Sequence, residues 1–327
     1  MKMYTHAWLA FMAMKRLQYA DLDTMSDKKV VADAKALVKW FKNYRDFVIE
    51  GAWYPDHVFK DMKESHVIKY KPVPVEKVEK MTPEELAAYP KFHKLPASIS
   101  MYNQGKKSSL YNKPFVITGG NCADRCEAIC HDLVDNLKML RTEDKGSPIA
   151  PSNNHIAMRF FILSHYIADC HMPLHCDNRS FSEGADIHGW IEGQWEDNIK
   201  KSYSIDKDND RFFYDPQGYP LATDKQSQLM KDIEAEIIGR HYVHSWGTDN
   251  GNTWDYMSAV SEFSYLKAYR MIPKEYDHTN INADVFKTLE GGINFDQYTK
   301  EILCDAVDSI SRAWLHAWSR YRRWAKL

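Results

Sequence analysis

The chain has 327 residues, 44% of them hydrophobic, and a formal net charge of −2 at pH 7. This is enough material for one large hydrophobic core or two ordinary ones, and the near-neutral charge offers no basic footprint for duplex nucleic acid. No apolar run reaches the roughly 18 residues that a transmembrane segment needs, and six cysteines are too few for a disulfide scaffold in a chain of this length.

The hydrophobic pattern is helical from the first residues onward. Residues 1–17, MKMYTHAWLAFMAMKRL, contain an apolar stretch but no small-residue cleavage site, so we interpret them as the first helix and expect no signal peptide in the chain as given. Apolar residues at helical spacing predict a second helix between a cap at Ser26 and a stop at Gly51. Residues 122–142 and 153–172 follow, and the latter segment is apolar nearly all round, which indicates a central buried helix.

Further helices are expected over residues 188–203, 225–246, 255–271 and 299–327. Residues 67–117 and 203–224 interrupt this pattern with proline, lysine and turn residues, and we expect both to be long loop excursions. The prediction is a single all-α domain over residues 1–327. In its last helix Trp314 and Trp318 share one face, which could contact a membrane peripherally but more often packs into the core.

Ionisable residues gather in the central helix and just after it. The stretch HYIADCHMPLH places His165 and Asp169 four residues apart, on one helix face, with His175 beyond Pro173. His188 and Glu192 repeat the four-residue spacing on the next helix. Imidazole and carboxylate together suit Zn²⁺. Any one of these residues alone would be read as a core hydrogen-bonding group, but five at ligand spacing predict a metal site.

Three upstream residues are further candidates. His6 lies in the first helix, Asp56 lies shortly after Gly51, and His66 follows in KESHVIKY. Each by itself is weak, because aspartate is common in loops and a lone histidine can cap or pack a helix.

The ordered set of His6, Asp56, His66, HYIAD, PLH and HGWIE resembles the superfamily of zinc-dependent phospholipases C and single-strand-specific zinc nucleases. The similarity covers residues 1 to about 200, and beyond them the chain matches only in being helical. The resemblance implies an all-α fold of the zinc phospholipase C and nuclease type with three zinc ions in a cleft.

The resemblance also implies a ligand set. Asp56, His66, His165 and Asp169 would hold one zinc, with Asp56 also orienting the attacking water as the catalytic residue. A second zinc would be held by His175, His188 and Glu192. Asp169 would bridge to a third zinc, bound by His6 and the amino group of Met1, where family members use a tryptophan exposed by signal-peptide removal. The bulky Lys2 disfavours removal of the initiator methionine, so a free Met1 amine could serve.

The implied activity is hydrolysis of a phosphodiester, either a phospholipid or a single-stranded nucleic acid. Glu192 favours the phospholipase branch, because the nucleases usually have aspartate there. Trp53, Tyr54, Phe59 and Trp190 could contact either a base or a lipid. A degenerate member that binds metal for stability and serves as a binding protein is the alternative. Most members of the superfamily are secreted.

Overall fold

The structure, a computed structural model, describes residues 1–19, 28–61, 65–143, 146–239, 251–289 and 294–327. Helices hold 63% of the residues, which confirms a predominantly α-helical fold. The larger helices of the described part are α1 (Met3–Tyr19), α2 (Lys28–Phe41), α7 (Cys122–Thr142), α8 (Asn153–His171), α9 (Ile187–Ser202), α10 (Gln228–Gly239), α11 (Thr253–Met271) and α13 (Phe295–Trp324).

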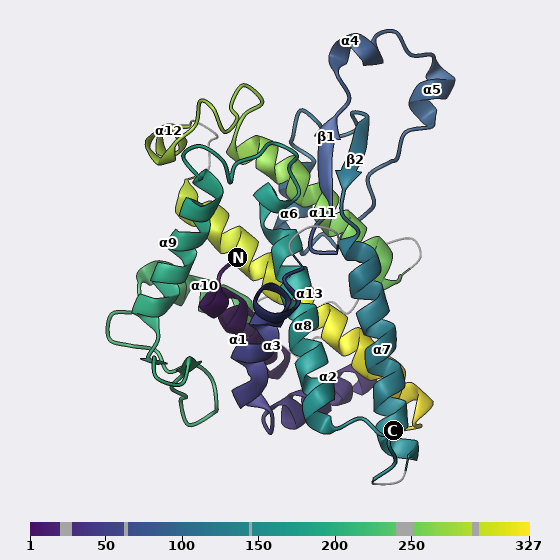
Figure 1. Cartoon of the computed structure of the whole chain (residues 1–327), viewed down its shortest axis with the longest axis vertical. Coiled ribbons are helices and arrows are strands. Elements are labelled where there is room, and N and C mark those ends of the chain that lie inside the picture. The colour runs from purple at the N-terminus through teal and green to yellow at the C-terminus, as the bar shows by residue number, and fades with distance from the viewer. Residues whose placement is uncertain (20–27, 62–64, 144–145, 240–250, 290–293) are drawn as a thin grey trace.

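The 30-residue helix α13 runs through the middle of the molecule (Figure 1) and packs against α1, α2, α7, α8 and α10. Its aromatic residues lie in the core: the ring of Trp314 is 4.7 Å from that of Phe41 in α2, and Trp318 is also buried. The expectation that these residues pack inward is therefore confirmed. A buried ion pair between Arg16 Nε and Asp308 Oδ1, 2.9 Å apart, ties α1 to α13 and so fixes the helix that carries His6.

Helix α8 is buried from Ile156 to its end, apart from two half-buried residues, with α3, α7 and α13 packed around it. The single helix predicted from Ser26 to Gly51 is wrong. The chain instead forms α2, a 3-10 turn η2 (Arg45–Phe47), the helix α3 (Val48–Tyr54) and a π-helical turn η3 (Pro55–Phe59). Ser26 lies outside the described residues. Gly51 stands inside α3, where a Cβ would lie 2.6 Å from Cβ of Phe161, so the glycine permits close packing on α8.

The excursion at residues 67–117 is built from short elements rather than an irregular loop. Strands β1 (Lys69–Pro72) and β2 (Phe115–Gly119) pair antiparallel at its base. Between them, α4 (Val75–Val78) and α5 (Pro83–Ala87) project from the body as an arm (Figure 1), and α6 (Ser100–Gly105) packs back on α11.

The second excursion, residues 203–224, contains the short pair β3 (Ile205–Asp206) and β4 (Arg211–Phe212). Two shorter elements complete the description, the 3-10 turn η4 (Pro173–His175) and the helix α12 (Ala283–Thr288). Residues 240–246 of the predicted helix 225–246 lie outside the described residues. Among the helices that are described, none has the length and apolar character to cross a bilayer.

Candidate metal centre

Six segments bring the predicted donors to one place. They are the start of α1, the π-helical turn η3, the segment before β1, the end of α8, the turn η4 and the first turns of α9. In chain order the donors are Met1, His6, Asp56, His66, His165, Asp169, His175, His188 and Glu192. As the four-residue spacing predicted, the two donors in α8 share one helix face, and so do the two donors in α9.

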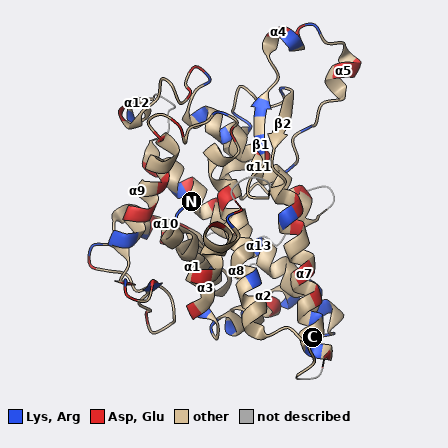
Figure 2. Cartoon of the chain, in the orientation of Figure 1, with Lys and Arg blue, Asp and Glu red and all other residues tan. Residues whose placement is uncertain are grey.

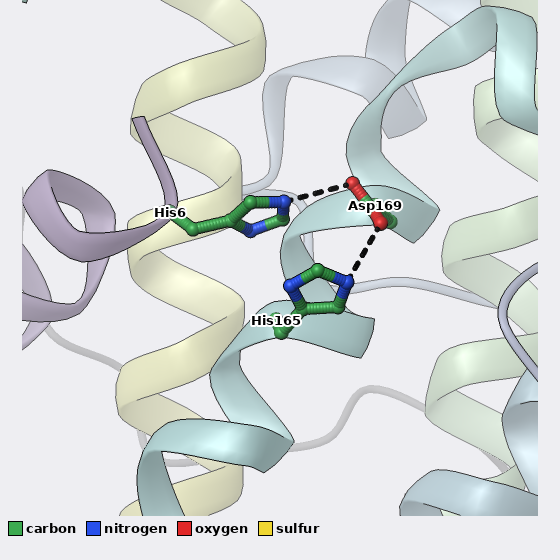
Figure 3. A group of neighbouring side chains, drawn as sticks. All are labelled: His6, His165 and Asp169. Carbon is green, nitrogen blue, oxygen red and sulfur yellow. Dashed lines mark ion pairs between the residues drawn. The ribbon is translucent and has the colours of Figure 1, made fainter. Parts of the chain in front are cut away.

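Asp169 is the centre of the arrangement (Figure 3). Its Oδ1 lies 2.7 Å from the Met1 nitrogen, 3.4 Å from Nε2 of His6 and 3.6 Å from Nδ1 of His175. Its Oδ2 lies 3.2 Å from Nε2 of His165 and also contacts Nε2 of His66. One fully buried carboxylate therefore faces nitrogen atoms from five other positions of the chain.

Three overlapping groups within the described residues have donor atoms close enough to hold a metal ion. They are His6, His165 and Asp169; then Asp56, His66 and His165; and finally His175, His188 and Glu192. Asp56 and His66 thus lie together, as do His175, His188 and Glu192, in the groups that the resemblance implied.

The Met1 nitrogen lies between the two carboxylates, 2.7 Å from Asp169 Oδ1 and 2.8 Å from Glu192 Oε1. Burial disfavours the charged amine, but these two carboxylates outweigh it and raise the pKa of the Met1 amino group to about 11. The resemblance implied that the amine lies with His6 and Asp169, and its contact with Glu192 is an addition.

Several buried donor atoms in the centre make no hydrogen bond: Nδ1 and Nε2 of His6, Oδ1 of Asp56, Nδ1 of His66 and Nδ1 of His175. Buried polar groups without a partner cost free energy. Burial, first of all, also lowers the pKa of His175 to about 4 and that of His6 well below its ordinary value, so both rings are neutral near pH 7. Neutral imidazoles with free lone pairs next to carboxylates fit a divalent cation.

His165 shows the same fit from its tautomer. Its Nδ1 lies 2.7 Å from the carbonyl oxygen of Ala52 in α3, and only a protonated Nδ1 can donate there. The other nitrogen, Nε2, faces Oδ1 of Asp56 at 3.4 Å and Oδ2 of Asp169 at 3.2 Å. Burial opposes a charged ring, but the two carboxylates raise the pKa of His165 to about 9. The carboxylates thus favour a positive charge at this point, and a metal ion could take the place of the proton.

Outer contacts hold the donors in position, as is usual for metal ligands. Ser182 Oγ lies 2.6 Å from Nδ1 of His188, which leaves Nε2 of that ring 2.8 Å from Glu192 Oε1. Glu196, one turn after Glu192 in α9, accepts hydrogen bonds from the Thr5 backbone nitrogen at 2.9 Å and from the Tyr4 nitrogen at 3.3 Å. It therefore caps the start of α1, just ahead of His6.

Ser182, Glu196 and the Ala52 carbonyl were not found from the sequence. The glutamate spacing Glu192–Glu196 was the one available signal, since it places both carboxylates on the same face of α9.

An open hollow of about 460 Å³ adjoins the centre, lined by Met3, Trp53 and His57 among others. The Trp53 ring is 6.1 Å from that of His6 and 6.4 Å from that of His165, so this tryptophan separates the hollow from the donors. The ring of Trp190, by contrast, lies 5.4 Å from that of Phe295 and packs against the hydrophobic core. No family model, curated protein or solved structure matches the chain.

Proposed function

We propose that the protein is a zinc-dependent hydrolase of phosphate esters, a phosphodiesterase similar to phospholipase C. The observation that carries the proposal is the position of Asp169, whose two oxygens face nitrogen donors from α1, α8, η4 and the segment before β1. One carboxylate that serves several donor groups is suited to a cluster of cations rather than a single ion. The resemblance to the zinc phospholipases C and zinc nucleases supports zinc as the ion.

A phosphodiester is an anion and resists attack by an anionic nucleophile. Divalent zinc, when bound, neutralises phosphoryl oxygens and acidifies water. The residues of the chain would hold and orient the reactants: Asp56, whose Oδ1 makes no hydrogen bond and lies 3.4 Å from Nε2 of His165, would be both a metal ligand and the residue that orients the attacking water. His165 and Asp169 are fully buried, so bulk water does not reach these two side chains.

The lipid substrate is proposed over the nucleic acid because of Glu192, the residue type that the resembled phospholipases have at this position. The hollow lined by Trp53 offers a substrate a place to bind beside the centre. Its lining includes three carboxylates, Asp46, Glu50 and Asp210, and one arginine, Arg211. This excess of negative charge disfavours the successive phosphates of a nucleic acid.

Metal content and turnover measured together test the proposal. Elemental analysis should find at least two zinc ions per chain, and chelation should lower the melting temperature because the buried donors lose their partner. Phosphatidylcholine, a single-stranded oligonucleotide and bis-(p-nitrophenyl) phosphate are then assayed with and without zinc. Zinc-dependent release of phosphocholine supports the phospholipase branch. Cleavage of only the oligonucleotide would move the protein to the nuclease branch, and retained zinc without any hydrolysis would leave a metal-stabilised binding protein.

A further inference from the structure

The base of the arm carries a concentration of positive charge. The segments 69–72, 91–94 and 106–119 contain seven lysines and no acidic residue, although the whole chain has a net charge of −2. These lysines are Lys69, Lys71, Lys91, Lys94, Lys106, Lys107 and Lys113. All except Lys69 are exposed, and Figure 2 shows basic residues in blue on β1, at the base of the arm.

Two of the lysines face a common hollow. Lys91 and Lys113 line a depression of about 370 Å³ together with Tyr89, Pro90 and Phe92. Neither lysine forms an ion pair with any residue that the structure describes. An ammonium group without a carboxylate partner, at the edge of an aromatic depression, is suited to an anionic group.

A second hollow, of about 490 Å³, shares Tyr89 and Pro90 with the first. It is lined by Ala88, Phe115, Val116 and Ile117, and Ile117 in β2 is 56% exposed. When a lipid covers a large aliphatic side chain of this exposure, apolar surface is removed from water, which favours binding. The surface is therefore amphipathic: one hollow offers cations and the adjoining one offers apolar contact.

We propose that this surface docks the protein on a lipid bilayer that contains anionic phospholipids, with the lipid phosphate at Lys91 and Lys113 and apolar contact at Ile117. A lipid is favoured over a nucleic acid because the exposed large apolar side chain at the two hollows is Ile117, whereas the rings of Tyr89 and Phe92 are half-buried. Binding of single strands relies on exposed aromatic rings for stacking. The inference goes beyond the proposed hydrolysis, since docking requires neither zinc nor turnover.

The docking surface is continuous with the metal centre through the backbone. The Tyr70 nitrogen of β1 donates to the Cys176 carbonyl at 3.0 Å, and the Asn178 nitrogen donates to the Tyr70 carbonyl at 3.1 Å. Cys176 directly follows His175, and β1 begins three residues after His66. A bilayer docked at the base of the arm would thus lie near β1, the strand that follows His66 and is hydrogen-bonded to the residues just after His175.

Cosedimentation with vesicles tests the proposal. The protein should bind mixed phosphatidylcholine–phosphatidylglycerol vesicles more tightly than vesicles of phosphatidylcholine alone, and added salt should weaken the difference. The double variant Lys91→Glu, Lys113→Glu should lower the partition coefficient for mixed vesicles by about tenfold or more. Ile117→Asp should lower it for both kinds of vesicle. The control Lys225→Glu, Lys231→Glu changes the net charge equally at exposed positions away from the arm and should have a much smaller effect.

Hydrolysis of bis-(p-nitrophenyl) phosphate keeps the two proposals apart, because none of these variants touches the metal centre. An unchanged rate shows that a variant is folded and that its vesicle result concerns docking alone. If the wild-type protein bound both vesicle types equally, if the arm and control variants lost binding equally, or if a single-stranded oligonucleotide displaced the protein from mixed vesicles, lipid docking at this surface would be wrong.

Discussion

Glu196 of α9 accepts a 2.9 Å hydrogen bond from the backbone nitrogen of Thr5 in α1. The helix that presents His188 and Glu192 thus also holds the helix that presents His6. Backbone donors at a helix N-terminus have no partner within the helix, and a carboxylate satisfies them and interacts favourably with the helix dipole. The position of His6 therefore depends on a residue that is not itself among the donors.

Replacing Glu196 with alanine should free the start of α1. We expect a loss of about 0.5–2 kcal/mol in the free energy of unfolding, the usual effect of removing a helix cap, and weaker binding of the ion nearest His6. Chemical denaturation and zinc titration measure the two effects. Asp197→Ala is the matched control, because this neighbouring carboxylate is exposed. Similar losses in the two variants would contradict a capping role for Glu196.

Replacing Gly51 with alanine should push α3 away from α8. The added Cβ would lie 2.6 Å from Cβ of Phe161, so one helix has to move. Overpacking of this kind costs about 1–3 kcal/mol. The shift would also lengthen the contact between the Ala52 carbonyl and His165, so zinc affinity should fall along with stability.

Gly239→Ala in α10 is the control for that change, because a Cβ there meets no described atom within 4 Å. Alanine exceeds glycine in helix propensity by up to about 1 kcal/mol, so this variant should be neutral or slightly more stable. Equal melting temperatures for Gly51→Ala and the wild-type protein would show that the two helices separate without cost.

The donors with short-range spacing were accessible from the sequence, and those set by tertiary packing were accessible only through the resemblance. His165 with Asp169 and His188 with Glu192 follow from helix geometry alone. Asp56 and His66 approach His165 from segments about a hundred residues away, and no local pattern reports such contacts. Residue type predicts secondary structure poorly where a residue is needed for packing. Glycine often ends a helix, yet Gly51 lies inside α3 and permits the close contact between α3 and α8.

Because Asp169 is central, we expect Asp169→Asn to damage zinc binding and activity more than Glu192→Gln does. Asp169 contacts donors of all three groups, whereas Glu192 contacts the Met1 nitrogen, His175 and His188. Asp169→Asn should therefore lose more zinc per chain than Glu192→Gln and should also lose more phosphodiesterase activity. Elemental analysis of both purified variants provides the comparison, and equal zinc content would refute a shared role for Asp169.

The contacts of Met1 predict that residues added ahead of it will alter the centre. An added residue converts the amino group into an amide, whose nitrogen has no lone pair available for a metal. Because Met1 is only 4% exposed, the added peptide must also displace neighbouring residues to reach solvent. The same addition at the C-terminus leaves Asp169 and Glu192 unchanged, so the two forms of the protein are a matched pair.

If the Met1 nitrogen and His6 hold an ion together, the N-terminally extended form should lose about one zinc and most of its phosphodiesterase rate. Cleavage that restores Met1 as the first residue should recover both. His6→Ala should lower the zinc content by a similar amount without moving the N-terminus. Matching zinc content and rates in the two extended forms would assign His6 to packing against His165, whose ring lies 3.9 Å away, and would leave the chemistry to the other two groups.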